Sequence, residues 1–365
     1  MLTGDIRISM SKALYVHIPF CRSICAYCDF CRVFYEASLA ESYLDAMEKE
    51  AKKYQGQKFE TVYIGGGTPS SLSEEQFERL LTILKPFASE AKEYTVEINP
   101  ETLNERKAEL LISYGVNRVS LGVQSFQKRL LAMMERRHTY DDVVNSVQLL
   151  RKAGIMNISC DLLYGLPTQS IEEFMDSLRK CVELSIEHIS FYMLTIEPHS
   201  KFARLHYETQ SEELSDEMYF QGISYLEENG YAQYEISNFA RKGYESKHNK
   251  VYWHYEDYAA LGMGASGKEN GIRYTNTSNF VKYFREEYVE EETILDEESL
   301  NFETVMMGLR LKEGIDIPED LYQYYREVIE RLVQEGKLEY SNHHLRCVGE
   351  NYYLLNEILI DFIRN

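Results

Sequence analysis

The stretch "TVYIGGGTPSSLSEEQFERLLTIL", residues 61–84, decides the fold class because it contains one complete strand, loop and helix. Its β-branched and apolar beginning predicts a buried strand that ends in a run of glycines near Gly66. Ser73 then precedes an acidic first turn, and leucines at helical spacing form one apolar face, which predicts an amphipathic helix. The stretch is therefore one unit of an alternating α/β fold.

The same unit recurs along most of the chain. The stretch "HTYDDVVNSVQLLRKAG" repeats the helix design, with Thr139 as its N-cap, Asp142 three residues later and Gly154 as its stop. This alternation predicts a parallel sheet covered by helices, in either an open doubly wound sheet or a closed or partly closed barrel. The strand candidates are residues 14–18, 61–66, 94–99, 118–124, 158–165 and 188–194, with a weaker seventh at 234–239.

Polar residues follow several of these strands at the point where each strand ends. Ligands collect outside the C-terminal ends of parallel strands in both architectures. The residues at these positions therefore invite a functional interpretation: the glycines after Ile64, then Glu97, Asn99, Gln124, Asp161, Thr195 and Glu197.

Composition and charge exclude some classes of protein. The 365 residues allow one large domain and one small one, and the net charge of -20 argues against a nucleic-acid partner. The N-terminal residues 1–18 lack an apolar run of signal-peptide length, and no uncharged apolar stretch long enough to span a bilayer follows. We therefore expect a cytoplasmic protein.

The last part of the chain has a different pattern. From Asp296 onward the sequence predicts helix, hairpin and helix, which resembles a small winged-helix-like module. The abundance of Asp and Glu there favours a covering or docking role over DNA binding. We expect a core over residues 1–241, a connecting segment with the motif "HNKVYW" over 242–295, and a C-terminal domain over 296–365.

Four of the seven cysteines lie in one short run directly after the first strand. Cys21, Cys25, Cys28 and Cys31 have the spacing C-x3-C-x2-C-x2-C, whereas structural zinc sites usually bring two separated C-x2-C pairs. The compact run favours an iron–sulfur cluster over zinc, and both over disulfides. If three thiolates bind and not four, one iron is left open to a substrate or cofactor.

The other three cysteines stand alone in the sequence. We interpret Cys160, Cys181 and Cys347 as small buried hydrophobic residues.

The stretch "CRSICAYC", residues 21–28, resembles the signature of radical S-adenosylmethionine (SAM) proteins. The resemblance implies that Cys21, Cys25 and Cys28 hold a four-iron four-sulfur (4Fe-4S) cluster. It also implies that SAM chelates the fourth iron, and that one electron from the cluster cleaves SAM to a radical.

Further motifs narrow the resemblance. Eight stretches together resemble the oxygen-independent coproporphyrinogen III oxidase-like group, most closely its HemW branch of heme chaperones. They are "YVHIPFC", "YIGGGTPSSLS", "VEINPE", "RVSLGVQSF", "DLLYGLPTQS", "YMLTIEP", "YEISNFAR" and "HNKVYW". They run in order from Tyr15 to Trp253, and the tail resembles the group's HemN-like C-terminal domain. This resemblance implies a partial (β/α)6 barrel for the core.

The resemblance also implies the residues of the cofactor site. It places Tyr15 beside SAM and assigns Arg136 to the family's arginine. The remaining positions line the SAM site at the strand ends, where carboxylates and an amide can bind ribose hydroxyls or an amino group: Gly66, Gly67, Thr68, Glu97, Gln124, Asp161 and Thr195. The glycine run is equally compatible with a tight turn.

His248 in "HNKVYW" corresponds to a motif linked to heme binding in the HemW branch. An imidazole is a common axial ligand of heme iron. The alternative is that the motif forms a capped turn that closes the barrel onto the second domain.

Two departures from the classical oxidases favour the HemW branch. The first strand begins near the N-terminus, and Cys31 comes three residues after Cys28 in place of two. The working hypothesis is a protein that binds a 4Fe-4S cluster, SAM and heme, receives electrons from a donor and passes heme to an acceptor protein, with peripheral membrane contact during delivery. The alternatives are oxidative decarboxylation of coproporphyrinogen III and, less compatible with the charge, a radical SAM enzyme that modifies nucleic acid.

Overall fold

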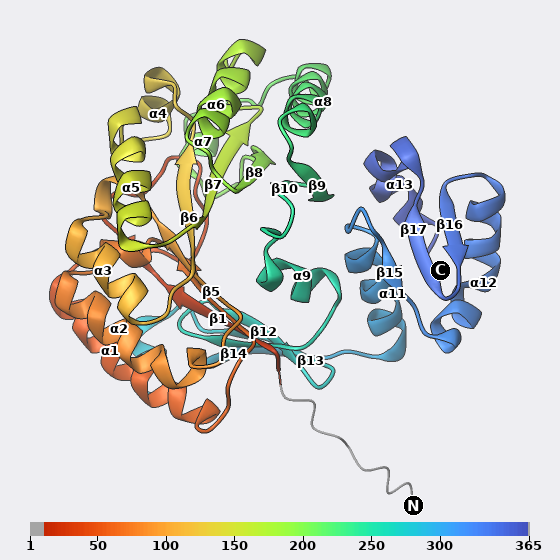
Figure 1. Cartoon of the computed structure of the whole chain (residues 1–365). Coiled ribbons are helices and arrows are strands. Elements are labelled where there is room, and N and C mark those ends of the chain that lie inside the picture. Colours follow the sequence, from red (N-terminus) through yellow and green to blue (C-terminus); the bar gives the residue numbers. More distant parts are fainter. Residues whose placement is uncertain (1–10, 364–365) are drawn as a thin grey trace, which may run out of the picture.

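The computed structural model describes residues 11–363 and shows a curved sheet with helices on its outer side (Figure 1). The C-terminal domain faces the open side of this sheet. The sequence feature that argued against a signal peptide, residues 1–18, lies mostly outside the described residues. None of the helices between residues 11 and 363 combines the length and the apolar character that a bilayer crossing requires.

Six parallel strands form the core, and each lies within one residue of the bounds that the sequence predicts. Consecutive strands are neighbours throughout, as right-handed strand–helix units require. The strands, in their order in the sheet, are β1 (Ala13–Ile18), β4 (Thr61–Gly66), β5 (Glu93–Ile98), β6 (Arg118–Gln124), β7 (Asn157–Tyr164) and β8 (His188–Met193).

Helices connect these strands on the outer side of the sheet. Ser73 and Thr139 each form the predicted capping box, and Gly154 ends its helix in the left-handed region with φ 103°. The helices of this layer are α1 (Ala37–Ala51), α2 (Glu74–Ala88), α3 (Glu105–Ser113), α4 (Lys128–Met133), α5 (Tyr140–Ala153), α6 (Ile171–Glu183) and α8 (Glu212–Glu228). Short helical turns η1 (Lys52–Tyr54), η2 (Pro69–Ser71), η3 (Pro100–Thr102) and α7 (Lys201–Arg204) complete it.

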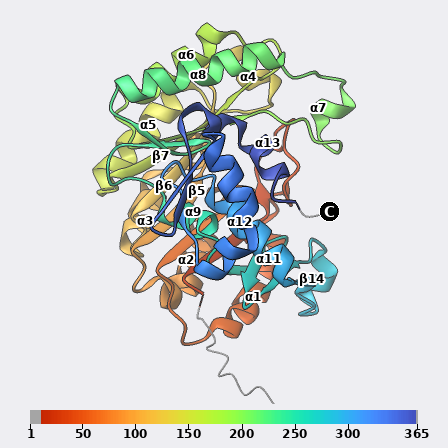
Figure 2. The same cartoon turned by 90° about the vertical axis from the view of Figure 1, so that its right-hand side faces the viewer.

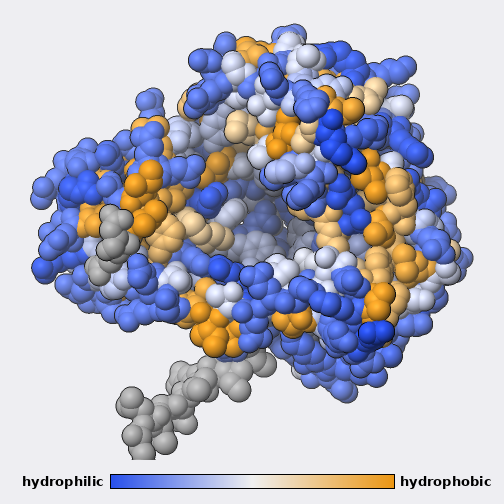
Figure 3. Space-filling view, turned by 180° about the vertical axis from the view of Figure 1, so that it is seen from behind, coloured by the Kyte–Doolittle hydropathy of each residue, from blue (hydrophilic) through white to orange (hydrophobic). Residues whose placement is uncertain are grey.

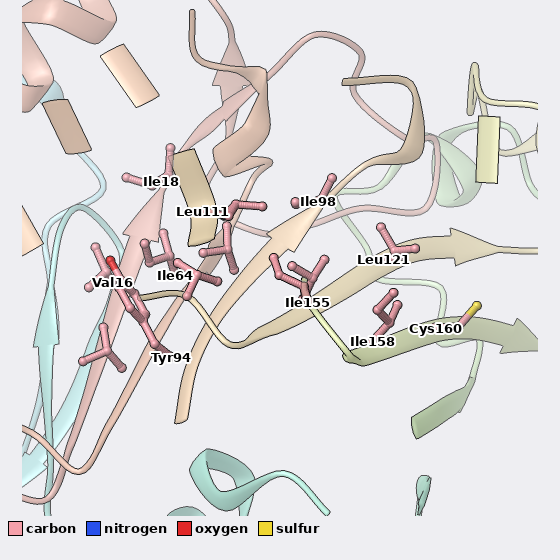
Figure 4. Close-up of a cluster of buried hydrophobic side chains, with 14 of the residues drawn as sticks. Val16, Ile18, Ile64, Tyr94, Ile98, Leu111, Leu121, Ile155, Ile158 and Cys160 are labelled. Carbon is pink, nitrogen blue, oxygen red and sulfur yellow. The ribbon is translucent and has the colours of Figure 1, made fainter. Parts of the chain in front are cut away.

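The outer face of the sheet is apolar and packs under the helices. Alternate residues of each strand point to this side, so that Val16, Ile64, Leu121 and Ile158 lie in one continuous cluster (Figure 4). Cys160 and Cys181 belong to the same cluster and Cys347 to that of the C-terminal domain, which confirms that these thiols are small buried hydrophobic groups.

The inner face of the same strands is polar. The residues that alternate with the apolar ones are Tyr63, Glu97, Ser120, Asp161 and Ser190, and all five border a cavity. A closed barrel fills this space with bulky aliphatic side chains. Here the lumen is hollow, and the molecule seen from behind is deeply hollowed between the sheet and the C-terminal domain (Figure 3).

Additional strands extend the sheet at both edges and leave it unclosed. At one edge β11 pairs in parallel with β1, and antiparallel strands follow it; at the other, the weak seventh strand proves to be two short strands. The fold is therefore the expected partial barrel. The added strands are β11 (Tyr258–Leu261), β12 (Ser266–Glu269), β13 (Ile272–Asn276), β14 (Val289–Ile294), β9 (Ala232–Glu235) and β10 (Asn238–Ala240).

The connecting segment thus does more than join two domains. Four of its strands belong to the main sheet, and α10 (Phe280–Phe284) packs beside α1. The division of the chain at residues 241 and 295 remains a proposal.

The C-terminal domain has its own hydrophobic core and contains the predicted helix, hairpin and helix. Its helices lie in front of the open side of the sheet (Figure 2). The winged-helix likeness remains a prediction. The elements are α11 (Glu297–Gly308), β15 (Ile315–Asp316), α12 (Glu319–Gln334), β16 (Leu338–Ser341), β17 (His344–Cys347), η4 (Gly349–Leu354) and α13 (Leu355–Ile360), with the sheet order β15, β17, β16.

The helix α9 (Lys247–Trp253), which carries "HNKVYW", closes the N-terminal end of the lumen. Glu93, the first residue of β5, is 2% exposed and accepts hydrogen bonds from the N–H groups of Lys247 (3.0 Å) and His248 (2.9 Å) and from Ser246 Oγ (3.3 Å). One buried carboxylate thus fixes the start of the helix to the bottom of the sheet.

We expect Glu93→Ala to lower the free energy of unfolding by about 3 kcal/mol, because it leaves buried donors without an acceptor. The exposed Glu105, paired on the surface with Lys152, is the matched control, and its replacement by Ala should cost well under about 1 kcal/mol. Urea unfolding followed by circular dichroism measures both, and equal losses would show that the Glu93 carboxylate does not hold α9.

Candidate functional site

The cavity of about 420 Å³ extends from the C-terminal ends of the parallel strands down the polar inner face of the sheet. It brings together eleven of the thirteen residues that the sequence assigned to the cofactor site, while Tyr15 and His248 do not line it. The eleven are Cys21, Cys25, Cys28, Gly66, Gly67, Thr68, Glu97, Gln124, Arg136, Asp161 and Thr195.

The cysteine loop is fixed at its two ends and in its middle. Its ends form a small parallel pair, β2 (Phe20–Cys21) with β3 (Val33–Phe34). In its middle, Ala26 donates from its N–H to Met134 O at 3.0 Å and accepts from the N–H of Phe202 at 2.9 Å. These backbone bonds hold the three thiols at the rim of the cavity without using their sulfur atoms.

Two of the three sulfurs face a hydrogen-bond donor. Thr68 Oγ1 donates to Cys21 Sγ at 3.7 Å, and Arg136 Nη1 donates to Cys25 Sγ at 3.6 Å. Burial raises the pKa of Cys21 to about 12 and that of Cys28 to about 11, so these thiols need a metal to ionise at neutral pH. The donors fit sulfur atoms that carry negative charge, as the thiolate ligands of an iron–sulfur cluster do.

The arrangement does not suit a single metal ion. Among residues 11–363, no three side chains of His, Cys, Asp or Glu converge closely enough to hold one. A cluster is different because each thiolate binds its own iron.

Cys31 does not share the position of the other three cysteines. It does not line the cavity, and it packs so closely on Gly264 that a Cβ there would lie 2.6 Å from Cys31 Cβ. His17 Nε2 donates to the carbonyl oxygen of Cys31 at 2.7 Å and fixes the end of the loop. Cys31 is therefore a packed neighbour in this structure.

The glycine run lets the end of β4 pass close to the cysteine loop. Gly66 has φ 108°, and a Cβ on it would lie 2.6 Å from the His17 ring. A Cβ on Gly67 would lie 2.9 Å from the backbone of Pro19 and 3.0 Å from Cys21 Sγ. The run thus serves as a tight turn, and it also leaves backbone exposed at the cavity.

Two partly buried carboxylates lie on the strands that flank β6, and both border the lumen. Glu97 accepts hydrogen bonds from Tyr63 Oη at 2.8 Å and from the N–H of Gly66 at 3.1 Å, and Asp161 accepts from Ser120 Oγ at 2.8 Å. Burial raises the pKa of Glu97 to about 7, with a further contribution from the charge of Asp161, and burial also raises the pKa of Asp161. A cation in the cavity would relieve both effects.

Gln124 and Arg136 lie above these carboxylates. Gln124 has φ 65° at an irregularity in the pairing of β6 with β7, which turns the end of the strand toward the cavity. Arg136 donates through Nη2 to the carbonyl oxygen of Gly122 in the same strand. The guanidinium therefore joins the end of β6 to the cysteine loop.

Tyr15 lies one layer away from the cavity. Its hydroxyl shares a hydrogen bond with His17 Nδ1 at 3.1 Å, and its ring stacks on that of Tyr63, with 6.2 Å between the centroids. Tyr63 in turn lines the cavity.

His248 lies at the opposite end of the sheet from the cysteines and is buried. Its Nδ1 shares a hydrogen bond with Thr61 Oγ1, and its Nε2 shares one with Tyr252 Oη, both at 2.8 Å. Burial lowers its pKa to about 3, so the imidazole stays neutral. Both ring nitrogens are occupied, and the residue does not offer a free ligand to iron in this conformation.

Sequence reasoning missed several residues that line the cavity, among them Tyr63, Arg118, Ser120, Ser190 and Asn249. The signal was present in the strands, because polar residues alternate with apolar ones in "RVSLGVQ" and "HISFYM". A strand that is apolar on one face and polar on the other predicts that its polar side chains line an internal cavity.

Comparison with known proteins agrees with this geometry. Residues 15–181 match the radical SAM superfamily, and residues 295–349 match the HemN C-terminal domain. The fold resembles the solved structure of coproporphyrinogen III oxidase (HemN) from Escherichia coli, a radical SAM enzyme, with a TM-score of 0.83 over 97% of this chain and 90% of that one at 22% identity.

Two curated relatives are similar over almost their whole lengths. The heme chaperone HemW of Lactococcus lactis subsp. lactis is 37% identical over 96% of this chain and 97% of its own. The heme chaperone HemW of Bacillus subtilis is also 37% identical, over 96% of this chain and 99% of its own. The chain therefore belongs to the HemW family of radical SAM proteins.

Proposed function

We propose that this protein binds a 4Fe-4S cluster, SAM and heme, and that it passes heme to an acceptor protein. The observation that carries the proposal is the fixed loop that presents three thiols, and not the fourth, to a cavity that also contains carboxylate, hydroxyl and guanidinium side chains. The relatives named as heme chaperones support the heme part. An electron donor, an acceptor protein, a cytoplasmic location and peripheral membrane contact during delivery belong to the same proposal.

In this proposal, each part of the cavity has a separate task. Cys21, Cys25 and Cys28 hold the cluster, which supplies one electron to SAM when both are bound. Glu97 and Asp161 accept hydrogen bonds from the cationic or hydroxyl groups of SAM. Six further residues border the same space: Gly66, Gly67, Thr68, Gln124, Arg136 and Thr195. Tyr15 supports this space from behind, because its ring stacks on that of Tyr63.

Heme ligation by His248 is the part of the proposal that the geometry supports least. Iron could reach the imidazole only if the bond to Thr61 or the bond to Tyr252 were lost. The alternative interpretation, a capped turn that closes the barrel, matches the hydrogen bonds of Glu93 to the start of α9. The two interpretations differ in what a heme titration will show.

Anaerobic purification, with iron, sulfide and heme quantified per chain, tests the function. We expect all three to be present, and we expect heme to pass to a heme-free acceptor protein. If His248 only closes the barrel, His248→Ala will bind heme with the parent's spectrum but unfold at a lower temperature. Loss of the heme spectrum in a folded His248→Ala chain would assign the ligand to His248.

The competing enzyme function has its own readout in the same preparation. Incubation with SAM, a reductant and coproporphyrinogen III should leave the substrate unchanged. Turnover to the divinyl product would contradict a function limited to heme transfer.

Glu97 should make SAM binding depend on pH. Its pKa of about 7 means that the carboxyl is largely protonated at pH 6, and a cationic ligand must displace that proton. We therefore expect the affinity of the cluster-loaded protein for SAM to rise up to tenfold per pH unit below pH 7 and to level off above it. In Glu97→Gln the affinity should be lower and should lose most of this dependence on pH. Anaerobic equilibrium dialysis between pH 5.5 and 8 measures this, and identical pH profiles would remove Glu97 from the SAM site.

A further inference from the structure

The lower part of the lumen contains a buried cation that the cysteine loop does not use. Arg118, the first residue of β6, is 2% exposed and lines the cavity. Its Nη1 donates to Asn157 Oδ1 at 3.1 Å and to the carbonyl oxygen of Tyr244 at 3.0 Å, and both acceptors are neutral. Within residues 11–363, its guanidinium forms no salt bridge. A buried guanidinium without a direct ion pair is costly, so its place beside a cavity, with donors left over, points to an anionic ligand.

The guanidinium has donors left for such a ligand. Arginine carries five N–H groups, and both of these hydrogen bonds come from Nη1. Nε and Nη2 remain, and together they present the parallel pair of donors that matches a carboxylate.

The helix α9 supplies a second polar group at this level. Asn249 lines the cavity, while His248 beside it is turned toward Thr61 and Tyr252. The backbone N–H of Asn249 donates to Ser246 Oγ at 3.2 Å, which fixes the residue in the first turn of the helix. In the motif "HNKVYW", the histidine thus anchors the floor of the lumen and the asparagine faces its interior.

The charge of Arg118 acts on two neighbours in the lumen, His188 and Asp161. His188 shares hydrogen bonds with Ser159 Oγ (2.7 Å) and Tyr234 Oη (2.9 Å), and burial keeps its pKa well below the usual range, so it is neutral. Asp161 accepts a hydrogen bond from Ser120 on the adjacent strand, and the charge of Arg118 acts to lower its pKa although the two side chains form no direct ion pair. The other arginines that line the cavity, Arg32 and Arg136, bond to the cysteine loop or to the strand end above it.

We propose that Arg118 and Asn249 form a carboxylate-binding subsite at the floor of the lumen, below the cysteine loop. A single guanidinium whose hydrogen-bond acceptors are neutral and which also interacts with the charge of Asp161 suits a monoanion at most, and a phosphate dianion would lack a second cation. The carboxylate belongs either to a small free organic acid or to a carboxylate arm of a tetrapyrrole. The second source rests on the proposed function, whereas the subsite itself does not.

The test uses the full-length chain without cluster and the propionate ion as probe. Sodium propionate should raise the unfolding temperature in a saturable way relative to sodium chloride at equal ionic strength, and the neutral isostere propionamide should not. Arg118→Gln should weaken propionate binding about tenfold or more, because a charge-assisted hydrogen bond is lost. Arg106→Gln is the matched control, since Arg106 is an exposed arginine paired with Glu78.

A second variant guards against misfolding. If circular dichroism shows that Arg118→Gln does not fold, Asn249→Ala keeps the guanidinium and should still weaken propionate binding severalfold. The proposal is overturned if the parent gives no saturable response to propionate, or if the folded variants bind propionate as the parent does.

Heme and heme dimethyl ester separate the two sources of the carboxylate. A preference of the parent for heme over its diester that disappears in Arg118→Gln would assign the subsite to a tetrapyrrole arm. The same preference in both chains would assign it to a free organic acid. If the parent binds neither heme nor its ester, the proposed function fails while the propionate result stands.

Discussion

The two faces of the parallel strands have opposite character, and the rest of the structure depends on this difference. Residues such as Val16, Ile64 and Leu121 bury one face under the helices, where removal of apolar surface from water stabilises the sheet. Their neighbours in the same strands, such as Glu97 and Asp161, are forced to the other face. The stability of the sheet and the lining of the cavity therefore come from one alternating pattern. A shift of register by one residue would move the apolar residues into the cavity and the polar residues under the helices.

A polar inner face makes closure of the barrel unfavourable and gives the site its electrostatics. Carboxylates inside a closed aliphatic core would lack partners, whereas here they border a space that a ligand can occupy. The same burial raises the pKa of Glu97 to about 7 and lowers that of His248 to about 3. The lumen thus presents acidic groups near the cysteines and a guanidinium, Arg118, at its floor, so that one cavity offers different chemistry at its two ends.

Much of this could be predicted from local sequence. The strand bounds, the caps at Ser73 and Thr139 and the cysteine loop at the strand ends all follow from patterns within about 30 residues. Contacts between segments that lie far apart in the sequence could not be predicted in this way. The pairing of β11 with β1 joins residues from opposite ends of the core, and the weak seventh strand splits because residues between β9 and β10 turn back. The position of His248 at the far end of the sheet also follows from tertiary packing on Thr61 and Glu93, which no motif spacing encodes.

We propose that Cys21, Cys25 and Cys28 hold a cluster while Cys31 does not. The most direct measurement is the iron and sulfide content of anaerobically reconstituted Cys25→Ala and Cys31→Ala, compared with the parent. We expect a brown, oxygen-sensitive cluster in the parent and in Cys31→Ala, and its loss in Cys25→Ala. A full complement of iron and sulfide in Cys25→Ala, or its loss in a folded Cys31→Ala, would contradict this assignment of the ligands.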